Sequence, residues 1–240
     1  MRKLFRLVAL ILTLPALAGA FKLPKITLGP YVGAYLMDCT TINNQVLCID
    51  GDPSLGTAPI FGTELKIFLP KNNFIEVNLG YSPQKTVAGD PSWPWDTVKT
   101  SGELTVVPLA LTLGHDFQLM PKLWGSAGLT AGYTWATVAI DTQAVYYSKP
   151  RYNSHTVGRG GTPFLGLIAG ITLNLPHNID ASVNLGYHYG NIKQLTIKES
   201  NDPERIGSIL SYYDESLNNE KPLPIEISNP IFYYVIKYGF

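Results

Sequence analysis

The chain has few cysteines, few histidines and little charge. Of its 240 residues 2 are Cys and 4 are His, and only 15% are Asp, Glu, Lys or Arg. Lys plus Arg equals Asp plus Glu at 18 each, and no run of like charges marks a tail that would bind nucleic acid. No His lies near either Cys to complete a zinc site. We therefore expect no metal, no cofactor and no nucleic-acid partner.

The chain also lacks an apolar run long enough for a membrane-spanning helix, which needs roughly 20 residues. Its one early apolar stretch, residues 7–14, follows three basic residues and precedes the small-residue triplet 18–20. This order predicts a secretory signal peptide over 1–20, cleaved before Phe21, with a single domain over 21–240. A retained membrane anchor is the alternative, and a helical membrane protein is excluded.

The two cysteines, Cys39 and Cys48, enclose eight residues in a segment rich in Thr and Asn. In an exported protein this spacing predicts one local disulfide. Closing so short a loop is expected to stabilise the fold by somewhat under about 3 kcal/mol. Two unrelated free thiols are the alternative.

Where helical runs are absent, alternation with a period of two is abundant. Gly (22), Pro (18) and Tyr (14) are frequent, as in a chain of turns and aromatic strands. Eight segments place apolar residues at every second position, the period of a strand whose two faces meet different environments. They are 25–37, 60–69, 73–81, 104–117, 123–135, 163–175, 179–190 and 232–240.

The second face of these segments is mostly Gly, Ser, Thr, Asn and Tyr rather than the Lys and Glu of a soluble sheet. Small and polar residues fit the inside of a narrow closed barrel, while the apolar face meets lipid. Closure is required because an open edge in hydrocarbon leaves backbone groups unpaired. The sequence predicts an all-β fold, a monomeric transmembrane up-and-down antiparallel β-barrel of eight strands.

The connections alternate in length, which supports this fold. Short ones near residues 71, 120 and 177 alternate with long ones at about 38–59, 82–101, 141–162 and 191–226. Short periplasmic turns and long extracellular loops are the outer-membrane arrangement. In the last loop a helical spacing predicts a short surface helix after Pro203, formed by Ile206, Ile209, Leu210, Tyr213 and Leu217.

Six polar or charged residues point inward by the period-two count and form a predicted lumen cluster. They are Glu64, Lys66, Glu76, Asp180, His188 and Lys237. Pairing across the turn near residue 71 sets Lys66 opposite Glu76. Ion pairs of this kind are most simply a satisfied polar filling that narrows the lumen, and a gate or conduction path is the alternative.

Histidines are the candidates for an enzyme. A hydrolase needs a Ser and a His within hydrogen-bond reach and an orienting acid. His188 faces the lumen beside Ser182, and His115 is on a lipid-facing register with Asp116 on the opposite face, while His155 lies in a loop and His177 in a turn. We expect no catalytic residues and no enzyme, and keep a lipid-modifying outer-membrane hydrolase as the alternative.

Aromatic residues flank the apolar band at both ends. On the loop side they are Tyr81, Tyr133, Trp135, Tyr187 and Tyr189, and on the turn side Phe117, Tyr238 and Phe240. Amphipathic rings of this kind form girdles at the two membrane interfaces.

This pattern resembles the small outer-membrane β-barrels of the OmpA, OmpX and OmpW-like group over nearly the whole mature chain. The resemblance is carried by "GPYVGAYL", by the hairpin from "VVPLALTLGHDF" to "LWGSAGLTAGYTW", and by the terminal "YGF". It implies location in the Gram-negative outer membrane, with lipid and lipopolysaccharide as surroundings. The implied role is structural or surface-binding, or a porin-like, narrow OmpW-like conduit for small hydrophobic molecules.

The resemblance also implies a role for the last strand. In such proteins the barrel assembly machinery reads a C-terminal strand that ends in an aromatic residue. Tyr234, Ile236, Tyr238 and Phe240 match that signal. Deleting Phe240 is therefore expected to lower the amount of protein reaching the membrane.

Overall fold

The structure is a computed structural model that describes residues 24–47, 55–87, 97–145, 152–214, 218–228 and 230–240. The predicted signal peptide, 1–20, lies outside these residues, so its cleavage stays a prediction. No helix within the described ranges is long and apolar enough to cross a membrane.

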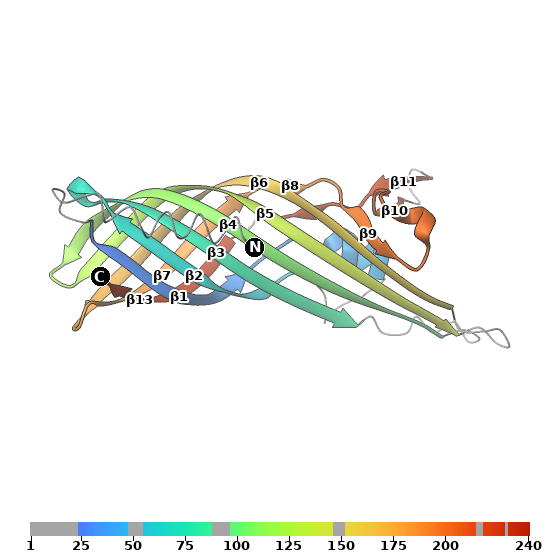
Figure 1. Ribbon diagram of the computed structural model, residues 1–240, viewed down its shortest axis with the longest axis horizontal. Coiled ribbons are helices and arrows are strands. Elements are labelled where there is room, and N and C mark those ends of the chain that lie inside the picture. Colours follow the sequence, from blue (N-terminus) through green and yellow to red (C-terminus); the bar gives the residue numbers. More distant parts are fainter. Residues whose placement is uncertain (1–23, 48–54, 88–96, 146–151, 215–217, 229) are drawn as a thin grey trace, which may run out of the picture.

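Eight antiparallel strands form a closed ring, as the alternation predicts (Figure 1). They are β1 (Ile26–Tyr35), β2 (Ala58–Phe68), β3 (Asn73–Val87), β4 (Thr97–Met120), β5 (Leu123–Val145), β6 (Tyr152–Leu175), β7 (Ile179–Tyr189) and β13 (Pro230–Gly239). Each pairs with its neighbours in sequence, and β1 pairs with β13 to close the ring. Short turns join β2 to β3, β4 to β5 and β6 to β7, so the predicted eight-stranded barrel is confirmed.

The strands on one side of the ring are much longer than predicted. β4, β5 and β6 have 24, 23 and 24 residues, and β3 has 15. The predicted loops at 82–101 and 141–162 are therefore wrong at their flanks, which continue as strand. At about 3.4 Å per residue and a tilt near 40°, β4 spans about 60 Å along the barrel axis. The apolar band of an outer-membrane barrel is about 25 Å tall, so this wall extends well beyond the bilayer.

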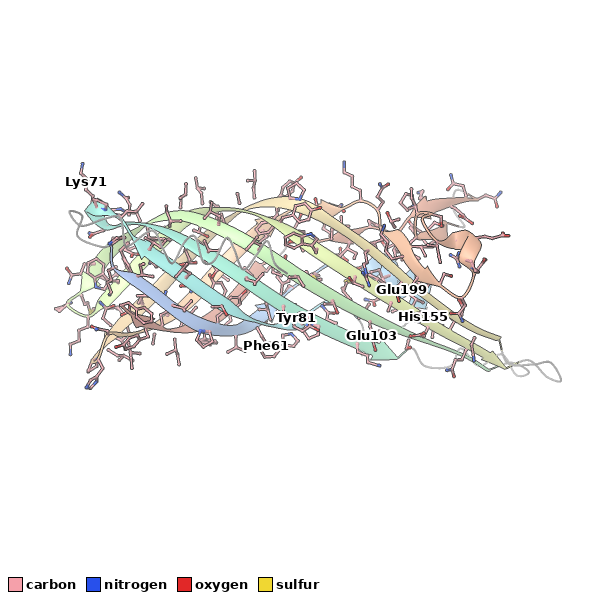
Figure 2. All side chains as sticks on the ribbon, in the orientation of Figure 1. Phe61, Lys71, Tyr81, Glu103, His155 and Glu199 are labelled. Carbon is pink, nitrogen blue, oxygen red and sulfur yellow. The ribbon has the colours of Figure 1, made fainter. Side chains whose placement is uncertain are left out.

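The outer surface shows where the bilayer ends. Apolar and aromatic side chains are exposed along the turn-side half and reach Phe61, Tyr81 and Trp135. Beyond them the outward positions carry ion pairs, with Lys85 bound to Glu103 at 2.5 Å and Arg159 to Glu199 at 3.0 Å. In Figure 2 Phe61 and Tyr81 lie near the middle of the molecule, whereas Glu103 and Glu199 lie toward the loop end. The loop-side half therefore stands in water.

The inside of the water-exposed half is apolar. Its core comes from inward residues of the long strands and from two loops that fold over the shorter strands. The buried members include Tyr35, Ile60, Leu104, Val106 and Val138 from the wall, Ile42 and Leu47 from the first loop, and Leu195, Ile197, Leu210, Leu223, Ile225 and Ile227 from the last. The first loop contributes the π-helical turn η2 (Ile42–Leu47). This half has its own hydrophobic core.

The last loop is mainly β-structure rather than the predicted helix. It contains β8 (Asn191–Ile192), β9 (Thr196–Ser200), β10 (Ser211–Asp214), β11 (Asn219–Pro222) and β12 (Ile225–Glu226). Among the described residues of this loop, helix is limited to the 3₁₀ turn η4 (Pro203–Arg205), where the Asp202 side chain accepts a hydrogen bond from the Glu204 amide. The turn ends at Ile206, which is extended, and Leu217 lies outside the described residues. Leu210 is buried in extended structure rather than on a helical face: its amide donates to the Leu195 carbonyl, and its carbonyl accepts from the Leu223 amide.

Cys39 is a buried free thiol within the core of the water-exposed half. Burial raises the pKa of this thiol to about 12, which keeps it protonated and unreactive. Cys48 lies outside the described residues. The predicted Cys39–Cys48 disulfide is therefore not supported.

Candidate functional site in the lumen

A layer of charged side chains crosses the turn-side half of the lumen. Glu64 and Lys66 come from β2, Glu76 from β3, Asp180 from β7 and Lys237 from β13, and all five are at most 5% exposed. They point inward because the strand period of two places each on the face opposite the lipid-facing residues. Five of the six residues of the predicted cluster thus lie in this layer, whereas His188 lies among aromatic rings.

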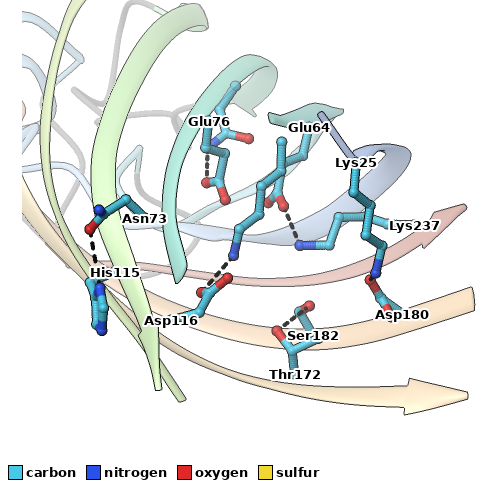
Figure 3. Close-up of polar contacts among 12 residues, drawn as sticks. Lys25, Glu64, Asn73, Glu76, His115, Asp116, Thr172, Asp180, Ser182 and Lys237 are labelled. Atoms are coloured by element: carbon cyan, nitrogen blue, oxygen red, sulfur yellow. Dashed lines mark hydrogen bonds and ion pairs between the residues drawn. The ribbon is translucent and has the colours of Figure 1, made fainter. Parts of the chain in front are cut away.

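The partners within this layer differ from the simplest expectation (Figure 3). Lys66 lies opposite Glu76 in the β2–β3 register, but its Nζ binds Asp116 of β4 at 2.7 Å. Lys237 binds Glu64 at 2.5 Å. Each pair joins two strands that have one other strand between them, β3 for Lys66–Asp116 and β1 for Lys237–Glu64, so a register count within a hairpin cannot reveal it.

Two members of the layer were missing from the predicted cluster. The alternation predicts that Asp116 faces inward, but the predicted cluster does not include it. Lys25 precedes β1, and its Nζ lies 3.6 Å from Asp180. An aromatic ring also contacts the layer: the ammonium of Lys66 lies 3.8 Å from the ring centre of Phe74. Such a contact holds a desolvated cation in place.

A cavity of about 220 Å³ lies at the turn-side mouth, below the charged layer. Its walls include Lys25, Phe68 and Trp124 as well as Asp116 and Asp180. We call it the vestibule. It is the place where the periplasmic side meets the charged layer.

Above the charged layer the lumen is nearly filled by rings. Tyr31 and Tyr233 lie 4.9 Å apart between ring centres, and His188 stacks on Phe164 at 4.3 Å. The cavity between these residues measures only about 20 Å³, room for about one water molecule. The lumen is therefore closed at two levels, by ion pairs and by aromatic packing.

His188 does not form the Ser–His pair of a hydrolase within the described chain. Its Nδ1 is buried without a hydrogen-bond partner among those residues. The hydroxyl of Ser182 is instead hydrogen-bonded to Thr172 at 2.9 Å. His188 instead packs against the rings of Phe164 and Tyr35.

The other three histidines lie outside the lumen. His115 faces outward as predicted and bonds to Asn73, and His177 lies in the turn between β6 and β7. The loop position predicted for His155 is wrong, because it lies on β6 and binds Asp141 at 2.6 Å on the water-exposed wall. Among the described residues no group of three or more His, Cys, Asp or Glu side chains could hold a metal ion.

The terminal strand presents its predicted face to lipid. Tyr234, Ile236, Tyr238 and Phe240 are all exposed, and the ring of Phe240 packs edge-on against Tyr238. The Phe240 amide donates to the carbonyl of Ile26 at 2.8 Å, so the last residue belongs to the closing seam. The role of these residues as an assembly signal stays a prediction.

A gap interrupts the ladder between β3 and β4. Pairing runs through Leu79 with Leu109 and resumes at Ser82 with Val106, so two pairs are skipped, one of which would include Pro108. Proline has no amide hydrogen to donate, which explains the interruption. Pro108 also lines the small aromatic cavity of the lumen.

No protein-family model matches the chain, and no curated protein sequence matches it either. Among solved structures, it is similar to the outer membrane protein OprG from Pseudomonas aeruginosa, with 9% identity, a TM-score of 0.49, and 92% of this chain and 98% of that one covered. The attachment invasion locus protein Ail of Yersinia pestis is similar too, with 10% identity, a TM-score of 0.44, and 91% of this chain and 100% of that one covered. Neisserial surface protein A has 13% identity and a TM-score of 0.41, with 90% of this chain and 97% of that one covered. The closed ring, its apolar belt and its aromatic borders make this chain an eight-stranded β-barrel of the outer-membrane type.

Proposed function

We propose that this protein is a sealed outer-membrane barrel whose function lies in the structure that it holds above the bilayer. The carrying observation is the double closure of the lumen. Ion pairs bridge the lumen wall above the vestibule, and beyond them a cavity of only about 20 Å³ lies between Tyr31, Tyr233 and His188. An aqueous channel needs a continuous path, which this packing does not provide.

The water-exposed half supports a surface-binding role. It is a wall of long strands with an apolar core, so it can present a fixed outer surface rather than loose loops. Charged residues such as Lys85, Arg159 and Glu199 cover its outside. Rigid scaffolds of this kind commonly position binding residues. Lipopolysaccharide and a surface ligand are the proposed partners, and the barrel assembly machinery is the proposed reader of the last strand.

A conduit for small hydrophobic molecules is the second candidate, favoured by the ladder gap at Pro108. The gap includes Pro108, which also lines the small cavity of the upper lumen. A hydrophobic solute could pass sideways there without crossing the charged layer. The lipid-modifying hydrolase has no such support, since His188 has no catalytic partner within the described residues.

Solute uptake distinguishes these functions. The purified protein is placed in vesicles with lipopolysaccharide in the outer leaflet, and entry of a small fluorescent hydrophobic solute is followed. A sealed barrel gives the rate of protein-free vesicles because its lumen is packed. A rate several times higher in the wild type, lost in Pro108→Thr, would replace the sealed barrel with the conduit. Folded protein in both samples is checked by heat-dependent gel mobility.

A further inference from the structure

The charged layer contains one more carboxylate than it has ammonium groups. Each lysine has a partner: Lys237 binds Glu64, Lys66 binds Asp116, and Lys25 lies next to Asp180. The fourth carboxylate is Glu76, which is 5% exposed. Within the described chain no ammonium lies at ion-pair distance from it, and its Oε1 accepts a hydrogen bond from Asn78 Nδ2 at 2.8 Å. When Glu76 is ionised, its charge has no ammonium at ion-pair distance within this layer.

Two oxygen atoms close to Glu76 are buried without a hydrogen-bond donor among the described residues. They are Oε2 of Glu64, a residue with no exposed surface, and Oδ1 of Asn78, a residue 9% exposed. Because Asn78 Nδ2 already donates to Glu76, its Oδ1 is the amide atom left to accept another partner. An unsatisfied buried acceptor costs about 1–3 kcal/mol, and more when it is charged.

These oxygens belong to neighbouring positions. Glu64 of β2 is directly opposite Asn78 of β3, and Glu76 is two residues from Asn78 on the same inward face. Diagonal neighbours across a sheet lie about 7–8 Å apart at the backbone, within reach of two Glu side chains. Figure 3 shows Glu64 and Glu76 extending from adjacent strands on one side of the lumen. The register therefore places the three side chains next to one another on the inward face of β2 and β3.

We propose that Glu64, Glu76 and Asn78 bind one monovalent alkali cation. The ligands are all oxygens, from two carboxylates and one amide, which suits a hard cation. A single positive charge balances the unpaired Glu76, and the cation supplies the partner that Glu64 Oε2 and Asn78 Oδ1 lack. A divalent ion would reverse the imbalance rather than remove it. The vestibule, lined by Lys66 and Lys237, connects this layer to the periplasmic side.

The experiment measures stability against the identity of the salt. The purified full-length barrel is unfolded by denaturant in detergent micelles, at constant ionic strength, with NaCl or KCl replacing choline chloride. A bound cation predicts that each tenfold rise in NaCl or KCl above its dissociation constant multiplies the folded-to-unfolded ratio by about ten. Choline is too large for a buried oxygen site, so it has no such effect.

Two variants assign the effect to the site. Glu76→Gln removes the unpaired charge, so it is expected to abolish the salt-identity effect and to raise stability in choline chloride. Glu103→Gln, on the exposed wall, is the matched control and keeps the wild-type response. Broadening of the ²³Na resonance by the folded wild type, reversed by KCl, reports binding without unfolding and covers the case in which a variant does not fold.

The contrary results are distinct. If Glu76 holds a proton instead, wild-type stability will not distinguish sodium from choline, and no ²³Na broadening will occur. If Glu76→Gln retains the full sodium effect, the cation binds elsewhere. Either result overturns the proposed site.

Discussion

Replacing Gly29 with valine is expected to prevent the barrel from closing. A Cβ at this position would overlap the carbonyl oxygen of Ile236 and would crowd the Cα of Lys237. Both are backbone atoms of β13, which cannot move aside without opening the β1–β13 seam. An open seam leaves backbone groups unpaired in hydrocarbon, at several kcal/mol each. The measurement is heat-dependent gel mobility, in which the folded fast-migrating band should be nearly absent.

A second glycine in the same seam provides the control. A Cβ at Gly239 would lie 3.3 Å from Cε of the flexible Lys25 side chain and 3.5 Å from the backbone oxygen of Asn178. Gly239→Ala should therefore fold close to the wild-type yield. Normal folding of Gly29→Val would show that the seam tolerates a wider separation than this register allows.

Replacing Lys237 with methionine is expected to destabilise the barrel by about 3–5 kcal/mol. The change leaves Glu64, which has no exposed surface, without its cationic partner in the middle of the lumen. A buried ion pair contributes little net stability, but removing one partner leaves a desolvated charge behind. The effect is read as a shift in the denaturant midpoint of the folded barrel.

Two further variants test this explanation. The double variant Glu64→Leu with Lys237→Met removes both charges and should recover most of the lost stability. Lys85→Met breaks the fully exposed pair with Glu103 and should leave the midpoint unchanged, because water screens that pair. A double variant as unstable as the single one would indicate that Lys237 acts through packing rather than through its charge.

The alternation of apolar residues predicts the eight strands, their order and the short turns, because lipid imposes one rule on every outward residue. The same rule explains where the prediction stops. Beyond Trp135 the outward positions of β5 become polar at Thr137 and Asp141, while the inward positions become apolar at Ala136 and Val138. The outer face of the strand meets water here instead of lipid. Polar residues therefore take the outward positions and apolar residues the inward ones, while the strand continues. A search for apolar outward residues ends at the bilayer.

Within the lumen, the period of two identifies which side chains point inward but not which partners they choose. Lys66 is opposite Glu76 in register, yet it binds Asp116 from a strand 50 residues away in sequence. Such pairs depend on barrel diameter and shear, which determine the inward side chains from non-adjacent strands that come into contact. The packing of the last loop was missed for a similar reason: the spacing of Ile209 and Leu210 fits a helix, but contacts with β9 decide the outcome.

Ion conductance through a planar bilayer tests the sealed barrel most directly. Protein refolded from residues 21–240 is added to one side at high salt, and single insertions are recorded under an applied voltage. Closure by the charged layer and by the Tyr31–Tyr233 and His188–Phe164 rings predicts a baseline without steady open steps. Stable, stepwise currents from heat-modifiable wild-type protein would contradict it and would require a continuous aqueous path through the lumen.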